Sequence, residues 1–338
     1  MYFYLKLKIE EIATNGGKMN QIKRSAVVLF NLGGPDSLNS VQAFLFNLFN
    51  DKAILNIFQP FRLLLAKFIA AKRTKKANAI YRQMGGKSPL LENTLAQAKA
   101  LEKILGNEYK VFVAMRYWHP FTEETIKTVK EYAPDEVILL PLYPQFSTTT
   151  TQSSFNEWYR VSRKIGLNVA TREIRDFPIN PQFIKAHVDL LKPFYQQALS
   201  YGTPRILFSA HSLPQKVINK GDPYQQQIEQ TAVAIIDELK ASLKLEDISY
   251  QVCYQSRVGP LKWLEPTLEQ ELIKAAKDKI PVVIVPISFV SEHSETLVEL
   301  DIDYRTRALE LGIPYYGRVP TLSCHPLFIE AMREMVIG

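Results

Sequence analysis

The chain has 338 residues, of which 46% are hydrophobic and 22% are charged. This length suits about two ordinary domains or one large one, and the composition is that of a folded globular protein rather than a disordered chain. The two cysteines, Cys253 and Cys324, are too few for a disulfide-rich fold, a cysteine-rich zinc module or a four-cysteine iron–sulfur cluster within one chain. A reducing compartment, the cytoplasm, is therefore expected.

Positive charge is concentrated in one segment. Lys and Arg total 41 against 34 Asp and Glu, and residues 52–91 hold nine of the basic side chains and no acidic one. Outside this segment the charges nearly balance. Because nucleic-acid binding needs basic residues spread over a docking surface, no nucleic-acid partner is expected.

The N-terminal residues 1–24 begin with an apolar stretch that is broken by Lys6, Lys8, Glu10 and Glu11. This stretch is too short for a secretory signal, and its acidic residues argue against a transit peptide. We interpret residues 1–24 as an N-terminal extension, with translation starting at either Met1 or Met19.

The most hydrophobic later stretch, residues 54–71, lies within an apolar and basic segment over residues 54–76. It contains Gln59, Pro60, Arg62 and Lys67, so it is too polar to span a bilayer. Two interpretations remain open. The segment is either an amphipathic helix that faces an anionic membrane surface, or an ordinary core-packing helix with a solvated basic face.

Apolar runs typical of strands alternate with helical patterns along the rest of the chain. Continuous apolar strands that alternate with helices predict a parallel sheet covered by helices on both faces, with ligands at the carboxyl ends of the strands. The predicted strands are 26–31, 111–115, 136–140, 169–174, 205–209, 250–254 and 282–285, and the predicted helices are 92–105, 122–132, 181–199, 224–243 and 268–277.

Two pairs of segments indicate an internal duplication. Val111–Pro120 resembles Val252–Pro260, and Pro141–Arg160 has the same spacing of Pro to Tyr-Arg as Pro286–Arg305. We therefore predict an α/β fold of two similar Rossmann-like domains with parallel sheets and an active-site cleft between them. The expected boundaries are 25–170 for the first domain, including the segment 54–76, and 171–320 for the second. A final helix within 321–338 is expected to cross back to the first domain.

His211 directly follows the predicted strand 205–209. A histidine at the carboxyl end of a parallel strand points into the expected cleft, where its near-neutral pKa suits proton transfer. Taken alone, this position fits a structural histidine equally well.

A second histidine, His293, lies just past another predicted strand and beside Glu292. The helix that follows carries Glu295, Glu299 and Asp303 at i, i+4 and i+8, so their carboxylates share one face. This pattern is either a solvated acidic face or a row of proton acceptors and oxygen ligands that leads away from His211. Histidine and carboxylate without cysteine suit a weakly held divalent ion such as Fe²⁺.

Aromatic and apolar side chains occur at or just after several predicted strand ends. Together with Leu32 and the apolar segment 54–69, they indicate a large, flat, apolar ligand whose acidic groups would meet arginines. The aromatic residues are Tyr117, Trp118, Phe146, Trp263 and Phe289.

An ordered set of motifs resembles the ferrochelatase family of haem synthesis. The motifs are Asn31-Leu-Gly-Gly-Pro35, Tyr81-Arg-Gln-Met-Gly-Gly-Lys-Ser-Pro89, Met115-Arg-Tyr-Trp-His-Pro120, Tyr143-Pro-Gln-Phe-Ser147, Phe208-Ser-Ala-His-Ser-Leu-Pro214, Gly221-Asp-Pro-Tyr224, Tyr254-Gln-Ser-Arg-Val-Gly-Pro-Leu-Lys-Trp263, Ser291-Glu-His-Ser-Glu-Thr-Leu297 and Glu299-Leu-Asp-Ile-Asp-Tyr304. The resemblance implies a lyase that inserts Fe²⁺ into protoporphyrin IX with loss of two pyrrole protons.

The resemblance also implies roles for individual residues. His211 would accept a pyrrole proton, Glu295 would take part in proton removal or metal handling, and both would contact the metal. The proton and metal path would continue through Glu299 and Asp303. The remaining site residues implied are Glu292 and His293 beside that path, Arg116 and Tyr117 on the opposite face of the porphyrin, and Leu32, Trp263 and Phe289 packed on the macrocycle.

No permanently bound cofactor is expected, since Fe²⁺ is a substrate. Animal-type relatives carry a cysteine-rich C-terminal extension with a [2Fe–2S] cluster, and this chain, with two cysteines and an end at Gly338, is expected to resemble the bacterial type without it. Coproporphyrin-using relatives have a tyrosine where this chain has Leu32, so protoporphyrin is the expected substrate. The protein is expected in the cytoplasm, either free or peripheral on the inner face of the membrane. The alternatives are a chelatase for another metal or for coproporphyrin, and a non-catalytic haem- or metal-binding protein.

Overall fold

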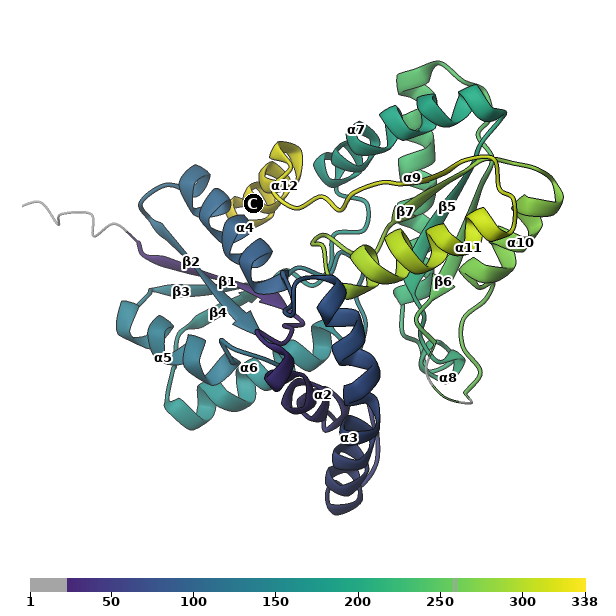
Figure 1. Ribbon diagram of the computed structural model, residues 1–338. Coiled ribbons are helices and arrows are strands. Elements are labelled where there is room, and N and C mark those ends of the chain that lie inside the picture. Colours follow the sequence, from purple (N-terminus) through teal and green to yellow (C-terminus); the bar gives the residue numbers. More distant parts are fainter. Residues whose placement is uncertain (1–22, 258, 260) are drawn as a thin grey trace, which may run out of the picture.

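The computed structural model describes residues 23–257, 259 and 261–338. Most of the expected extension 1–24 lies outside these residues, as do Val258 and Pro260 of the motif that ends at Trp263. The chain forms two four-stranded parallel sheets, with strand orders β2-β1-β3-β4 and β6-β5-β7-β8 (Figure 1). The predicted α/β fold with two similar halves is therefore confirmed.

The first sheet is buried on both faces because its central strand is apolar from Ala26 to Phe30. Val27 and Leu29 of β1 contribute to the largest core cluster, whereas Val28 and Phe30 pack into a second cluster with residues of α5 and α6. This half consists of β1 (Ser25–Asn31), a 3₁₀ turn (Leu38–Ser40), α2 (Val41–Phe49), α3 (Gln59–Gln83), α4 (Leu90–Leu105), β2 (Tyr109–Met115), α5 (Thr122–Tyr132), β3 (Glu136–Pro141), α6 (Thr151–Ile165) and β4 (Ala170–Glu173).

The second half repeats this plan with one difference in helix type. A π-helix, η3, follows β7 at the place where the regular helix α6 follows β3 in the first half. This half consists of α7 (Pro181–Ala198), a 3₁₀ turn (Leu199–Tyr201), β5 (Arg205–His211), α8 (Gln215–Ile218), α9 (Tyr224–Leu243), β6 (Tyr250–Gln255), α10 (Leu268–Lys277), β7 (Val282–Pro286), η3 (Glu295–Asp303), α11 (Tyr304–Glu310), β8 (Tyr316–Arg318) and α12 (Pro326–Ile337).

The duplication is real, but one of its equivalences was misaligned. Met115 in β2 donates its backbone N–H to the carbonyl of Pro120, and Tyr254 in β6 donates in the same way to Pro266. Each proline lies two residues before the next helix, α5 or α10. The counterpart of Pro120 is therefore Pro266 rather than Pro260, because the second half has additional residues between the strand and the turn.

Two further details differ from the sequence-based expectation. The expected domain boundary at residues 170 and 171 falls inside β4, which pairs with β3 and so extends the first sheet to Glu173. Strand β8 was not predicted, because it is only three residues long and contains Gly317. The C-terminal helix α12 packs against α4 of the first half and against α7 (Figure 1).

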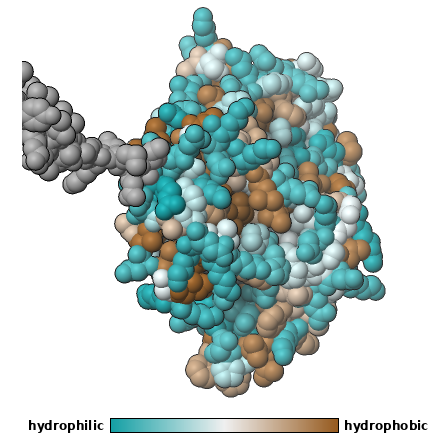
Figure 2. Space-filling model, turned by 90° about the vertical axis from the view of Figure 1, so that its left-hand side faces the viewer, coloured by the Kyte–Doolittle hydropathy of each residue, from teal (hydrophilic) through white to brown (hydrophobic). Residues whose placement is uncertain are grey.

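Helix α3 extends away from the body of the molecule, and it buries only Ala66, Ala70 and Tyr81 (Figure 1). Its N-terminal part exposes a group of large apolar side chains, and apolar surface gathers at the lower end of the molecule, where this end of α3 lies (Figure 2). No helix among the described residues is both long and apolar enough to cross a membrane. The exposed apolar residues of this region are Ile54, Ile57, Phe58, Phe61, Leu64, Leu65 and Phe68.

Candidate active site

His211 and Glu295 form a contact at the carboxyl end of the second sheet. His211 is the last residue of β5, and Glu295 is the first residue of η3. The Nδ1 atom of His211 lies 2.8 Å from Oε2 of Glu295, and the side chain of His211 remains 38% exposed. The fold thus brings together the two residues that the sequence singled out for proton and metal chemistry.

Burial and mutual attraction act in opposite directions on this pair. Burial by itself would lower the pKa of His211, but the nearby carboxylate of Glu295 raises it above its usual value. Burial would raise the pKa of Glu295, but the charge and hydrogen bond of His211 hold that pKa well below its usual range. The pair is therefore stabilised as imidazolium and carboxylate, and the imidazole becomes a base when this proton leaves.

Ser256 also belongs to this site, although sequence reasoning missed it. Its hydroxyl lies 2.9 Å from Oε2 of Glu295 and also contacts Glu299, and its backbone N–H donates to Oε1 of Glu299 at 3.1 Å. The backbone of Ser256 is in the left-handed region, with φ at 63°, which is uncommon for a residue other than glycine. Its place directly after β6 is the same strand-end signal that identified His211.

The amide of Gln255 contacts the carboxylate of Glu299 and the backbone of Glu295 from the buried side. Ser209 donates to Oε1 of Gln255 at 2.6 Å, which orients the amide so that Nε2 faces Glu299 at 3.3 Å and the carbonyl of Glu295 at 3.4 Å. Gln255 is almost completely buried. Residues 255 and 256 therefore bind both Glu295 and Glu299 through side-chain and backbone donors.

Glu299 and Asp303 differ in their surroundings. Burial, together with the charge of Glu295, raises the pKa of Glu299 to about 7. Asp303, at the far end of η3, is exposed to solvent. The three carboxylates therefore run from the contact with His211 toward the surface, with a group in the middle that can exchange a proton near neutral pH.

Glu292 and His293 lie beside this row and have separate partners. Oε1 of Glu292 lies 2.6 Å from Nη1 of Arg318 and accepts a hydrogen bond from the backbone N–H of Thr321. The ring of His293 lies against Phe289, with centroids 4.5 Å apart, and burial lowers its pKa. His293 is therefore favoured as a neutral imidazole.

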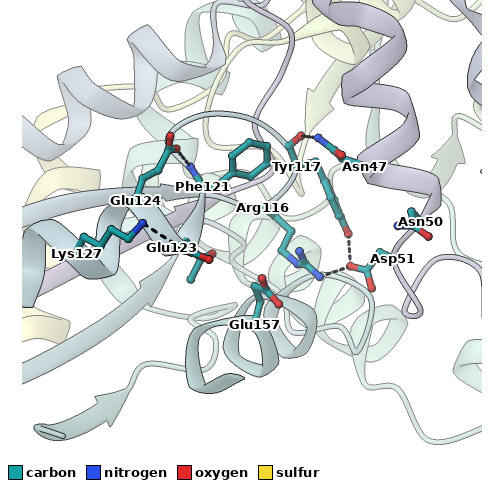
Figure 3. A pocket seen from close by; sticks show the side chains of 11 residues that line it. Asn47, Asn50, Asp51, Arg116, Tyr117, Phe121, Glu123, Glu124, Lys127 and Glu157 are labelled. Carbon is teal, nitrogen blue, oxygen red and sulfur yellow. Dashed lines mark hydrogen bonds and ion pairs between the residues drawn. The ribbon is translucent and has the colours of Figure 1, made fainter. Parts of the chain in front are cut away.

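Arg116 and Tyr117 meet at a carboxylate in the first half. Arg116 Nη2 and the hydroxyl of Tyr117 each lie 2.8 Å from Oδ2 of Asp51 (Figure 3). Ser153 donates to the same oxygen at 2.5 Å. Asp51 is buried, which by itself would raise its pKa, but Arg116 and these hydrogen bonds hold the pKa below its usual value. Sequence reasoning missed Asp51 because it follows a helix, α2, rather than a strand.

These residues line part of a cavity of about 470 Å³. Figure 3 shows Arg116, Tyr117 and Asp51 pointing toward one another, with Glu157 and Glu123 nearby. Tyr117 is only 1% exposed. Its hydroxyl contacts Asp51, and its ring belongs to the core cluster against which Leu32 packs.

Tyr81 connects the two halves of the site. Its ring packs in the core cluster of α2 and α3, and its hydroxyl lies close enough to Ser294 and Glu295 of the second half for both to act on its pKa. Burial, with a contribution from the charge of Glu295, raises the pKa of Tyr81 to about 12. Trp263 lies farther along the second half, where it pairs with Pro214 just beyond His211, and it is partly exposed, as are Leu32 and Phe289.

No group of three or more His, Cys, Asp or Glu side chains positioned to hold a metal ion occurs within residues 23–257, 259 and 261–338. The sequence predicted metal contacts from His211 and Glu295, and the structure brings these two residues together as a pair. The second ring nitrogen of His211 and a carboxylate oxygen of Glu295 are ligand atoms of the kind that suit a divalent ion.

Comparison with known proteins identifies the family, since the ferrochelatase family model matches residues 24–338. The chain belongs to the ferrochelatase family. The ferrochelatase of Wolbachia sp. subsp. Drosophila simulans (strain wRi) is 53% identical over 319 residues, which cover 93% of this chain and 99% of that protein. The ferrochelatase of Rickettsia bellii (strain OSU 85-389) is 49% identical over 319 residues, covering 93% of this chain and 87% of that protein.

Solved structures of chelatases share the fold. SirB from Bacillus subtilis with Fe³⁺ superimposes with a TM-score of 0.54 at 12% identity, over 93% of this chain and 94% of SirB. The sirohydrochlorin chelatase SirB in complex with cobalt gives a TM-score of 0.55 at 10% identity, with the same coverage. The predicted ferrochelatase resemblance and the two-domain chelatase fold are both confirmed.

Proposed function

We propose that this member of the ferrochelatase family inserts Fe²⁺ into protoporphyrin IX around the His211–Glu295 contact. The contact of 2.8 Å between Nδ1 of His211 and Oε2 of Glu295 is the observation that carries this assignment. Insertion requires removal of two pyrrole protons while the metal binds the nitrogens, so a base must lie within reach of the ring centre. His211 supplies that base on a rigid strand end, and the carboxylate of Glu295 stabilises the imidazolium that forms.

Protons then leave along η3. Glu295 is held as a carboxylate by His211 and Ser256, and Glu299, with its pKa raised to about 7, accepts a proton at little cost near neutral pH. Asp303 at the exposed end passes protons to solvent. The same carboxylates offer oxygen ligands to incoming Fe²⁺, and His293 and Glu292 border this route.

The porphyrin is proposed to bind between the two halves, with Arg116 and Tyr117 on the side opposite His211. Leu32, Trp263 and Phe289 are each partly exposed, as side chains that pack on a macrocycle must be. An apolar Leu32 suits the divinyl edge of protoporphyrin better than a more carboxylated ring.

Anaerobic mixing of the purified protein with protoporphyrin IX and Fe²⁺ tests the activity directly. Catalytic turnover should convert the porphyrin spectrum to that of haem in large excess over protein. A stoichiometric spectral change without turnover would instead indicate a non-catalytic haem- or metal-binding protein. Faster metallation with another divalent ion, or with coproporphyrin, would indicate a chelatase of different specificity.

We propose that the protein needs no resident cofactor. Cys253 is buried, burial raises the pKa of its thiol, and Cys324 is the second cysteine in the sequence. Two thiols are fewer than the four that hold a [2Fe–2S] cluster within one chain.

We also propose peripheral contact with the inner face of the cytoplasmic membrane through α3. Phe58 is 74% exposed, Phe61 and Leu64 are 65% exposed, and the following turns carry Lys72, Lys75 and Lys76. Large apolar side chains near a basic cluster are typical of helices that lie in a bilayer interface with anionic lipids. The apolar porphyrin would reach the site from that interface.

A further inference from the structure

Arg318, the last residue of β8, has a guanidinium that is nearly enclosed. Its side chain is 8% exposed, and it contacts two carboxylates at once. Nη1 lies 2.6 Å from Oε1 of Glu292, Nε lies 2.9 Å from Oδ2 of Asp301, and Nη2 also contacts Asp301. Nη1 therefore binds Glu292, while Nε and Nη2 bind Asp301, so all three nitrogens of the planar group have a carboxylate partner.

The two partners of Arg318 flank the carboxylates of the site. Glu292 lies three residues before Glu295, and Asp301 lies two residues after Glu299 on the same π-helix. Arg318 therefore joins the segment that enters η3 to the last turn of η3, and it fixes both relative to the second sheet through β8.

The contacts of Arg318 act on a π-helix, which is an uncommon backbone winding. Its i→i+5 hydrogen bonds, seen here where Tyr304 donates to the carbonyl of Glu299, are rare and occur mostly as short segments at functional sites. In η3 they accompany a geometry in which both Glu295 and Glu299 reach Ser256. A change to ordinary α-helical winding would alter the angle between successive side chains about the helix axis, so Glu299 would be displaced relative to Ser256 while Glu295 lies against His211.

We propose that Arg318 is a positioning residue for metal insertion, which holds both ends of η3 so that Glu295 stays against His211 and Glu299 stays against Ser256. This inference rests on the function proposed above. Arg318 does not touch the reacting groups. It acts through Glu292 and Asp301, and a planar guanidinium can bind both, whereas the single ammonium of lysine cannot match that fork.

The test compares Arg318→Met and Arg318→Lys with the wild type. The number of folded sites is measured by fluorescence titration with protoporphyrin, and turnover is expressed per bound porphyrin. We expect Arg318→Met to lower kcat about tenfold or more, with KM for protoporphyrin changed by less than about twofold, because the porphyrin contacts stay while the carboxylates move. Arg318→Lys should recover part of this loss.

The pH profile separates positioning from simple loss of folded protein. If Glu295 no longer lies against His211, the acidic limb of the kcat profile should move to lower pH in both variants. A reduced fraction of folded protein leaves the shape of the profile unchanged. Arg305→Met is the matched control, since Arg305 contacts Asp301 but not Glu292, and it should give a smaller change in kcat.

Normal turnover per bound porphyrin and an unshifted profile in Arg318→Lys and Arg318→Met would overturn the proposal. If Arg318→Met does not fold, Arg318→Lys, which keeps the positive charge, decides the question alone by the same two measurements. A wild-type protein without metallating activity would overturn the proposed function, and the positioning role with it.

Discussion

The side chain of Gln97 on α4 donates from Nε2 to the carbonyl oxygen of Val290, at 3.1 Å, across the boundary between the two halves. The same Nε2 donates to the carbonyl of Ser323 at 3.0 Å, and Oε1 accepts from the hydroxyl of Ser291 at 3.0 Å. Gln97 is fully buried. One amide of the first half thus holds the segment of the second half that leads into Glu292 and η3.

Gln97→Ala should destabilise the protein. It leaves the buried carbonyl of Val290, the partly buried carbonyl of Ser323 and one hydroxyl without their partner. Each buried group without a partner costs about 1–3 kcal/mol, so a loss of at least about 2 kcal/mol is expected. Urea unfolding followed by circular dichroism measures the change. The control is Gln226→Ala on the exposed side of α9, which should stay within about 0.5 kcal/mol of the wild type. Equal shifts in the two variants would contradict this role of Gln97.

His211→Ala should abolish most catalysis while porphyrin still binds. Loss of a positioned base lowers turnover by roughly 10²-fold or more. The amount of haem formed at fixed times under anaerobic conditions gives kcat, and a titration followed by protoporphyrin fluorescence gives the binding constant. His119→Ala serves as the control, because His119 is exposed and contacts Glu124 away from Glu295. Near-normal turnover in His211→Ala would exclude this residue as the essential base.

Glu295→Gln should move the acidic limb of the pH profile as well as lower the rate. The carboxylate of Glu295 raises the pKa of His211, so in the wild type the basic form of His211 appears only above that raised pKa and activity increases with pH through it. Without the carboxylate, burial lowers the pKa of His211, and the limb moves to lower pH. Glu299→Gln should shift it in the same direction by less, because Glu299 contributes less to the pKa of His211. A limb that stays in place in Glu295→Gln would show that another group titrates there.

Leu32 should favour protoporphyrin over coproporphyrin. A mismatched group in a pocket costs about 1–3 kcal/mol, so kcat/KM for protoporphyrin should be higher by about tenfold or more. Leu32→Tyr should narrow this ratio. Steady-state assays with both porphyrins and Fe²⁺ measure it, and equal use of the two by the wild type would disprove the assignment of Leu32 to substrate choice.

The protein should bind anionic vesicles at low salt and dissociate as salt increases. Each basic residue near such a surface contributes about 1 kcal/mol, which salt screens. A variant in which Lys67, Lys72, Lys75 and Lys76 are all replaced by Glu should no longer sediment with phosphatidylserine vesicles. Reversal of four exposed lysines elsewhere should weaken binding much less; the four are Lys99, Lys103, Lys185 and Lys277. If the wild type does not sediment with vesicles even at low salt, α3 is an ordinary solvated helix.

The sequence predicted the parts of this fold that depend on local pattern. Helices 122–132, 224–243 and 268–277 coincide with α5, α9 and α10, because each buries one regular apolar face. The pattern could not reveal that Glu295–Asp303 would be a π-helix, since the same spacing of carboxylates fits an α-helix. The strand-end rule located His211, and applied to β6 it would also have located Ser256.

The residues that sequence reasoning missed take part through distant contacts. Asp51 is a lone carboxylate after α2 until the fold places Arg116, Tyr117 and Ser153 around it. Arg318 follows a glycine in a three-residue strand, and nothing local links it to Glu292, 26 positions away. Such partners are set by sheet order and domain packing, which a single sequence does not encode locally.

The position of α12 has a consequence for synthesis. The largest core cluster contains Val27 and Leu29 from the start of the chain together with Met332 and Val336 from α12, which also packs on α4. Ribosomes add about 5–20 residues per second, and domains fold as they emerge. The first half therefore leaves the ribosome with part of this core uncovered, and the apolar surface of α4 stays exposed until α12 is made. A nascent chain that stalls before Pro326 presents that surface to chaperones.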